Sequence, residues 1–197
     1  MKTDLNAQCR NAIEFIQKLH FEISYLIKEI EGLLQKEPEN FIIERPAGYQ
    51  VTSRTSTGLD PGNVENWQPK TFTVFFCPSE RTKIIAGQTR TQFDRSLRLL
   101  IVHIEIMNQN KKGPRILYGC LTDIVNNKPK KITKIEYILA KFAYFNKKIF
   151  GALPNVSYSD TDCSFEGEFF EQLLFSINNS DDVMNKLVKN MLKLYRK

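Results

Sequence analysis

Residues 4–36 have the sequence DLNAQCRNAIEFIQKLHFEISYLIKEIEGLLQK, in which apolar side chains recur at alternating intervals of four and three. This spacing predicts a helix with one apolar seam, sustained over four heptads as in a left-handed coiled coil. The seam consists of Leu5, Cys9, Ala12, Ile16, Leu19, Ile23, Leu26, Ile30 and Leu33. A helix of about 33 residues is about 50 Å long, longer than a domain of this size is wide. We therefore predict a long amphipathic helix over residues 1–38, part of which projects.

The remaining residues, 39–197, are predicted to form a single α+β domain. Short strands are expected at 41–45, 49–52 and 70–77, and a β-hairpin over 96–125 is expected to form the centre of an antiparallel sheet. A capping box at Thr133-Lys134-Ile135-Glu136 starts a helix at about 133–150. A second helix, capped by Ser180, is expected at about 181–196. Residues 165–177 fit either a strand or a short helix.

The composition places the chain among ordinary globular proteins. Of its 197 residues, 42% are hydrophobic and 25% are charged, which excludes wholesale disorder and collagen-like repeats. Its apolar runs, such as 99–102, are far shorter than the roughly 20 residues that cross a bilayer, and residues 1–6 do not resemble a secretory signal. The four cysteines lie far apart without a C-x-x-C pair, so no zinc site is expected. We expect a soluble, cytoplasmic protein with reduced thiols and no metal or cofactor.

Positive charge is concentrated in one segment. Residues 111–150 contain ten Lys and Arg against two carboxylates, whereas residues 151–180 contain five carboxylates and no cation. Along the helix expected at 133–150, lysines alternate with tyrosines on one stripe, where phosphates can pair with ammonium groups and bases can stack on the rings. The nucleic-acid-binding candidates are Lys130, Lys131, Lys134, Tyr137, Lys141, Tyr144 and Lys148. Two alternatives stay open. The lysines keep the helix soluble, or the basic block, residues 111–150, contacts the acidic residues 160–171.

A second basic set surrounds Gly87. Arg90 and Arg95, with backbone amides and threonine hydroxyls nearby, are candidates for holding a phosphate or another anion. Solvated loop charge is the alternative interpretation.

Catalytic candidates are few, because the chain contains only two histidines. His20 lies beside the seam of the long helix and is interpreted as a flanking residue. His103, Glu105 and Asp123 share one face of the predicted hairpin, which is expected to be mixed while the other face is core. In the predicted register Asp123 lies opposite Leu99, and Arg115 is the natural partner of Glu105, so a cross-strand ion pair competes with a metal site.

These observations favour a non-catalytic subunit of a cytoplasmic protein complex. Its first helix would dock a partner protein or a second copy, and its basic surface would contact nucleic acid. The interface residues are Leu5, Ala12, Ile16, Leu19, Ile23, Leu26 and Ile30. One alternative is a metal-dependent nuclease or phosphodiesterase that uses His103, Glu105 and Asp123, with Arg90 or Arg95 holding phosphate. Another is a sensor of a small anionic, nucleotide-like ligand bound near residues 87–98.

Overall fold

The computed structural model describes residues 4–47, 71–85, 88–91, 94–106, 113–128 and 153–197. It confirms the α+β fold class: a long N-terminal helix, a six-stranded antiparallel sheet in the order β1-β2-β5-β6-β8-β7, and a C-terminal helix. The helices are α1 (Leu5–Leu34) and a continuous C-terminal run made of α3 (Ser180–Asp182), the π-helix η6 (Val183–Val188) and α4 (Lys189–Tyr195). The sheet consists of β1 (Phe41–Ala47), β2 (Thr71–Pro78), β5 (Leu99–Glu105), β6 (Arg115–Asn126), β7 (Asn155–Ser159) and β8 (Cys163–Leu173). A separate hairpin of β3 (Thr82–Ile85) and β4 (Gln88–Thr91) follows the short turn η3 (Ser79–Arg81), and η5 (Leu174–Ser176) follows β8.

Two local predictions are refined by these bounds. Residues 165–177 divide into the end of β8 and the turn η5, so the strand interpretation holds for most of the segment. The C-terminal helix is capped by Asn179 and not by Ser180, because the Asn179 side chain accepts a hydrogen bond from the Asp182 amide at 2.9 Å. The predicted helix at 133–150 and the predicted strand at 49–52 lie outside the described residues.

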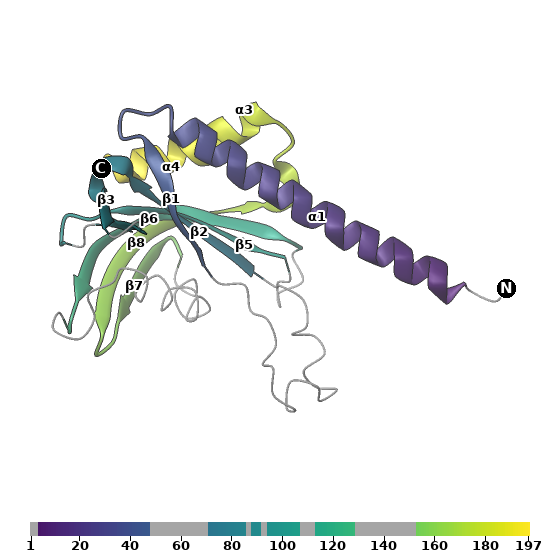
Figure 1. The fold of residues 1–197 in the computed structure, drawn as a ribbon, viewed down its shortest axis with the longest axis horizontal. Coiled ribbons are helices and arrows are strands. Elements are labelled where there is room, and N and C mark those ends of the chain that lie inside the picture. Colours follow the sequence, from purple (N-terminus) through teal and green to yellow (C-terminus); the bar gives the residue numbers. More distant parts are fainter. Residues whose placement is uncertain (1–3, 48–70, 86–87, 92–93, 107–112, 129–152) are drawn as a thin grey trace.

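Helix α1 begins at an aspartate cap. The Asp4 carboxylate accepts hydrogen bonds from the amides of Asn6 and Ala7, at 3.0 and 3.3 Å, which satisfies two of the donors that a helix start leaves open. The second half of α1 lies across one face of the sheet beside the C-terminal helix, and the first half extends past the sheet (Figure 1). The buried side chains of α1 are Ile23, Ile30 and Leu34, and all three come from the second half.

Both faces of the sheet carry a buried core. The hairpin face that was predicted to be mixed does include His103, Glu105 and Arg115, but its apolar residues form a second core that the prediction did not include. On the helix face, Leu100, Val102 and Ile104 of β5 pack with α1 and the C-terminal helix. On the other face, Leu99 and Ile101 belong to a second core. Its remaining buried members are Phe75, Cys77, Leu97, Leu117, Leu121, Ile124, Val156, Cys163, Phe165 and Phe169. A strand covered on both faces has a continuous apolar run in place of alternation, and the run at 99–102 is of this kind.

The predicted pairing of Glu105 with Arg115, beside the hairpin loop, is confirmed, but the predicted register at the open end of the hairpin is wrong. Glu105 pairs with Arg115 as expected, but Leu99 pairs with Leu121 and not with Asp123. A β-bulge lies between Thr122 and Val125, and Asp123 has a φ of 49°. The extra residue of a bulge changes which face the following side chains occupy, so Ile124 joins the second core and not the helix-facing core that the alternation predicts.

Candidate docking surface

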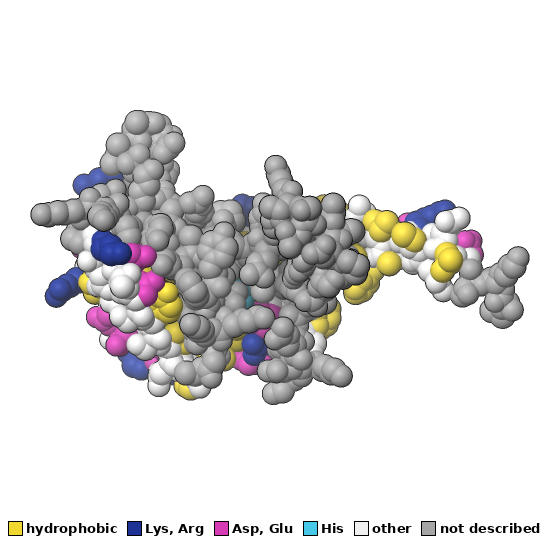
Figure 2. Space-filling view, turned by 90° about the horizontal axis from the view of Figure 1, so that it is seen from below, with side chains coloured by type: hydrophobic (Ala, Val, Ile, Leu, Met, Phe, Trp, Pro, Cys, Tyr) yellow, Lys and Arg dark blue, Asp and Glu magenta, His cyan; other side chains and the backbone are white. Residues whose placement is uncertain are grey.

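The projecting half of α1 and the two turns that follow it expose large hydrophobic side chains around the circumference of the helix. The exposed fractions are 74% for Leu5, 52% for Ile13, 63% for Phe15, 63% for Phe21 and 69% for Tyr25. Figure 2 shows hydrophobic side chains on this projecting end. A helix that is apolar on several sides is normally buried, so this segment has the composition of an interface.

The predicted seam is divided between two environments. Ile23 and Ile30 are buried in the core of their own domain, and Leu19 and Leu26 pack partly against it. Among the remaining predicted interface residues, Ile16 is half-buried, whereas Leu5 and Ala12 are exposed. The domain itself therefore occupies the second half of the seam, and only the first half is available to another molecule.

Three aromatic residues of this surface were missed by the seam analysis. Phe15, Phe21 and Tyr25 lie outside the four-three pattern, at positions that normally carry polar side chains. The signal that could have identified them is the presence of large apolar residues off the seam in a helix that is already amphipathic.

A row of alternating charges runs between these aromatic residues. Arg10, Glu14, Lys18 and Glu22 follow one another at intervals of four, and all four are exposed. Residues four apart form one inclined ridge on a helix surface. We call this row the charged ridge. Ile13, Phe21 and Tyr25 lie on the neighbouring ridge on one side, and Phe15 lies on the ridge on the other.

An apolar groove continues this surface toward the domain. It has a volume of about 400 Å³ and lies between α1 and the segment 174–183. Phe15, Leu19 and Tyr25 line it from α1, and Phe175 and Ile177 line it from the opposite side. Phe175 is itself 63% exposed, so the apolar surface extends from the projecting helix onto the body of the molecule.

The catalytic candidates are only partly brought together. His103 is fully buried on the second face, its Nδ1 is hydrogen-bonded to the Thr73 hydroxyl at 2.8 Å, and its Nε2 lies 3.7 Å from a Glu105 carboxylate oxygen. Arg115 binds Glu105 at 2.6 Å and Glu171 at 2.9 Å. Burial alone raises the pKa of Glu105, but the neighbouring His103 and Arg115 more than offset it and lower that pKa to about 2. Burial lowers the pKa of His103.

Asp123 does not join this cluster. Leu117, which pairs with His103, lies six residues before Asp123 on β6, a separation of roughly 20 Å along a strand. No group of three or more His, Cys, Asp or Glu side chains in the described part of the chain is arranged to hold a metal ion. The structure contains the predicted cross-strand ion pair between Glu105 and Arg115. His20, the other histidine, makes an edge-on contact with Phe72, with ring centroids 5.7 Å apart.

Of the ten Lys and Arg residues in the basic block, residues 111–150, only two lie in the described part of the chain, and both are paired with acidic residues. Arg115 binds Glu171, and Lys128 binds Asp162 at 2.6 Å. These contacts are of the kind expected if the basic block meets residues 160–171. The candidates Lys130, Lys131, Lys134, Tyr137, Lys141, Tyr144 and Lys148 lie outside the described residues.

The anion-binding candidates lie in different elements. Arg90 is on β4, opposite Lys83 of β3, and Arg95 is exposed in the turn before β5. Arg81, from the same basic set, is bound by Asp94 at 2.7 Å and by Ser96 at 3.1 Å.

The cysteines are free thiols. Cys77, Cys120 and Cys163 are buried, Cys9 is exposed on α1, and burial raises the pKa of Cys77 and of Cys120 to about 12. Buried thiols of this kind are unreactive packing residues.

No helix in the described ranges combines the length and the apolar character needed to cross a membrane. No protein-family model matches the chain, and no curated protein and no solved structure is significantly similar to it.

Proposed function

We propose that this protein is a binding subunit that associates with a second copy of itself through the projecting half of α1. The observation that carries the proposal is the exposure of five large hydrophobic side chains along α1, three of which, Leu5, Ile13 and Phe15, lie on the half that extends past the sheet. Helices shorter than about 12–15 residues are marginal in water on their own. Partner contacts would supply the packing that the segment lacks within its own chain.

The charged ridge is the reason for choosing a second copy as the partner. If two α1 helices pair antiparallel about a two-fold axis between Glu14 and Lys18, each Glu14 faces the other copy's Lys18. In the same register each Arg10 faces the other copy's Glu22. A parallel, in-register pair would place equal charges together, which is unfavourable. The ridge is thus self-complementary in one orientation, as an isologous interface requires.

Apolar burial and charge have different roles in this interface. Burying a Phe or Leu side chain is worth roughly 1.5–3 kcal/mol, whereas an exposed ion pair contributes about 0.2–1 kcal/mol. Phe15, Phe21 and Tyr25 would therefore supply most of the affinity, and the ridge would select the antiparallel orientation. The proposal places the protein in the cytoplasm, a reducing compartment that its four free cysteines suit.

A charge-swap cycle tests the proposal. Molar mass is measured by light scattering over a range of protein concentrations for the full chain, for Glu14→Lys, for Lys18→Glu, and for the double variant. Each single variant brings like charges together at two symmetric contacts, and we expect each to weaken the dimer about tenfold. The double variant restores opposite charges and is expected to restore the dimer.

A heterologous partner would not show this rescue, because its own charges would be unchanged. Lys193→Glu, a charge reversal on the exposed side of α4, serves as the matched control and should leave the dimer mass unchanged. A chain that stays monomeric at every concentration, or a double variant weaker than both singles, would overturn association with a second copy.

A further inference from the structure

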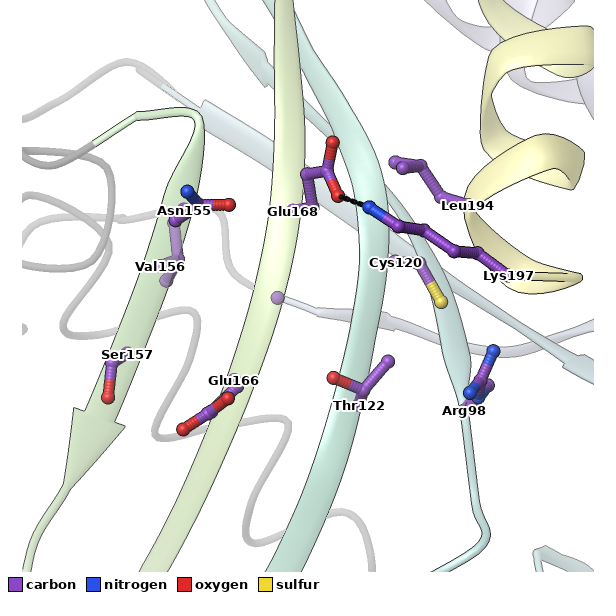
Figure 3. Close-up of a pocket in the computed structure, with 11 residues that line it drawn as sticks. Arg98, Cys120, Thr122, Asn155, Val156, Ser157, Glu166, Glu168, Leu194 and Lys197 are labelled. Atoms are coloured by element: carbon purple, nitrogen blue, oxygen red, sulfur yellow. Dashed lines mark hydrogen bonds and ion pairs between the residues drawn. The ribbon is translucent and has the colours of Figure 1, made fainter.

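A second concave site lies on the helix face of the sheet, beyond the end of α4. Its volume is about 440 Å³, within the range of small-molecule pockets. Figure 3 shows its polar side chains, which come from β6, β7, β8, the chain just before β5 and the C-terminal residue Lys197. The predicted interface on α1 contributes no residue to it, so the site is independent of the proposed dimer.

The residues that line the pocket form two rows across the strands, as the strand register shows. Thr122, Glu166 and Ser157 lie side by side on β6, β8 and β7. Arg98 extends this row, because the next residue, Leu99, pairs with Leu121. Neighbouring strands are about 4.8 Å apart, so the backbones at Arg98 and Glu166 are separated by roughly 10 Å with Thr122 between them.

The charged side chain of the second row, Glu168, already has an ion-pair partner. The second row contains Cys120, Glu168 and Asn155. The Lys197 ammonium group binds the Glu168 carboxylate at 2.9 Å. In Figure 3 this ion pair lies beside Leu194 at the end of the C-terminal helix. The helix end and the ion pair therefore bound one side of the pocket.

The first row keeps two opposite charges apart. The Arg98 guanidinium donates a hydrogen bond to the Tyr195 carbonyl at 2.7 Å, which holds it at the C-terminal end of α4. Glu166 is exposed on the far side of Thr122. Within the described ranges, neither Arg98 nor Glu166 forms an ion pair.

We propose that this pocket binds a small zwitterion of the amino-carboxylate class. The carboxylate would accept hydrogen bonds from the remaining guanidinium N–H groups of Arg98, a donor geometry that matches a carboxylate. The ammonium group would bind Glu166, with the Thr122 and Ser157 hydroxyls as further polar contacts. A ligand with only one charge would satisfy one end of the row and leave the other end unpaired.

The test is a titration calorimetry series with the full chain. The probes are glycine, β-alanine, 4-aminobutyrate and 6-aminohexanoate, which increase the separation between ammonium and carboxylate. Butyrate and butylamine, which carry one charge each, are the comparison ligands. We expect saturable binding with an optimum within the series, and affinities at least tenfold lower for butyrate and butylamine.

Two variants locate the binding site. Glu166→Gln should weaken the best zwitterion at least tenfold without lowering the melting temperature, because Glu166 makes no ion pair that the change removes. Glu171→Gln, on the same strand but paired with Arg115 on the opposite face, should leave the affinity unchanged. Failure of every series member to bind, or equal affinity in Glu166→Gln, would overturn the proposal.

Discussion

Phe169 shows how single residues determine the packing of the second core. Its fully buried ring lies over two glycines, Gly119 on the neighbouring strand β6 and Gly167 on β8 itself. A Cβ on Gly119 would lie 2.8 Å from a Phe169 ring atom, and a Cβ on Gly167 would lie 2.7 Å from another. A Cβ on Gly119 would also lie 2.1 Å from the Glu168 carbonyl oxygen. The backbone cannot easily move away, because β6 and β8 are hydrogen-bonded on both sides.

Gly119→Ala is therefore expected to lower the free energy of unfolding by about 2 kcal/mol or more, as overpacking of a core does. Gly32→Ala is the matched control, since no atom lies within 4 Å of its added Cβ and Gly32 is inside α1. It should raise the free energy of unfolding by about 0.5–1 kcal/mol. Urea denaturation of both variants measures the difference, and equal effects would contradict the assigned packing.

Glu105 links a buried histidine to a surface arginine and makes stability depend on pH. Its folded-state pKa, about 2, is below the ordinary value of 4.5. A carboxyl with a lowered pKa stabilises the fold above its unfolded pKa, and that contribution is lost as the pH falls through the folded value. The affected window is pH 4.5 down to about 2.

We predict that Glu105→Gln lowers the free energy of unfolding near pH 7 and that the deficit shrinks between pH 4.5 and 2. Urea denaturation at several pH values provides the measurement. Glu166→Gln, which removes an exposed carboxylate on the other face of the sheet, should show no such convergence. A Glu105→Gln deficit that is constant with pH would show that the stabilisation comes from packing and not from charge.

At the scale of elements, the C-terminal helix depends on its start. Asn179 is extended, with φ −159° and ψ 173°, and its side chain caps the Asp182 amide. Ser180 is the first helical residue, and its side chain is exposed. Both residue types are good caps, so the sequence alone does not distinguish between them.

Asn179→Ala is expected to cost about 1 kcal/mol of unfolding free energy, whereas Ser180→Ala should change it by less than about 0.5 kcal/mol. Thermal or urea denaturation of the two single variants compares adjacent positions under the same conditions. The reverse order would assign the cap to Ser180.

For the whole molecule, α1 has two roles that divide near residue 18. The part from Leu19 onward contributes Ile23, Ile30 and Leu34 to the helix-facing core. The part before it contributes none of the buried residues of that core. Removal of all of residues 1–38 would therefore remove core as well as interface.

We expect a chain of residues 19–197 to remain folded with a cooperative melting transition. It should be monomeric by light scattering, because it lacks Phe15 and the Glu14 and Lys18 side chains at the centre of the proposed contact. A chain of residues 39–197 should lose that transition, because it lacks three buried core side chains. Dimerisation of residues 19–197 would show that the projecting half of α1 is not the contact.

Local regularity in the sequence predicted the long helix, the hairpin, the C-terminal helix and the α+β class. Each depends on spacing within one segment: the four-three interval for α1 and strand-forming runs around a polar loop for β5 and β6. The Glu105–Arg115 pair was predictable for the same reason, since a hairpin brings nearby residues together.

Only the tertiary structure decided which surfaces these elements bury. Contacts between segments far apart in the chain determine four features. These are the second core, the bulge that separates Asp123 from His103, the division of the α1 seam, and the row from Arg98 to Ser157. Periodicity identifies an apolar face, but it does not specify what covers that face. Burial and pairing in three dimensions supply that information, because they depend on how the segments pack together.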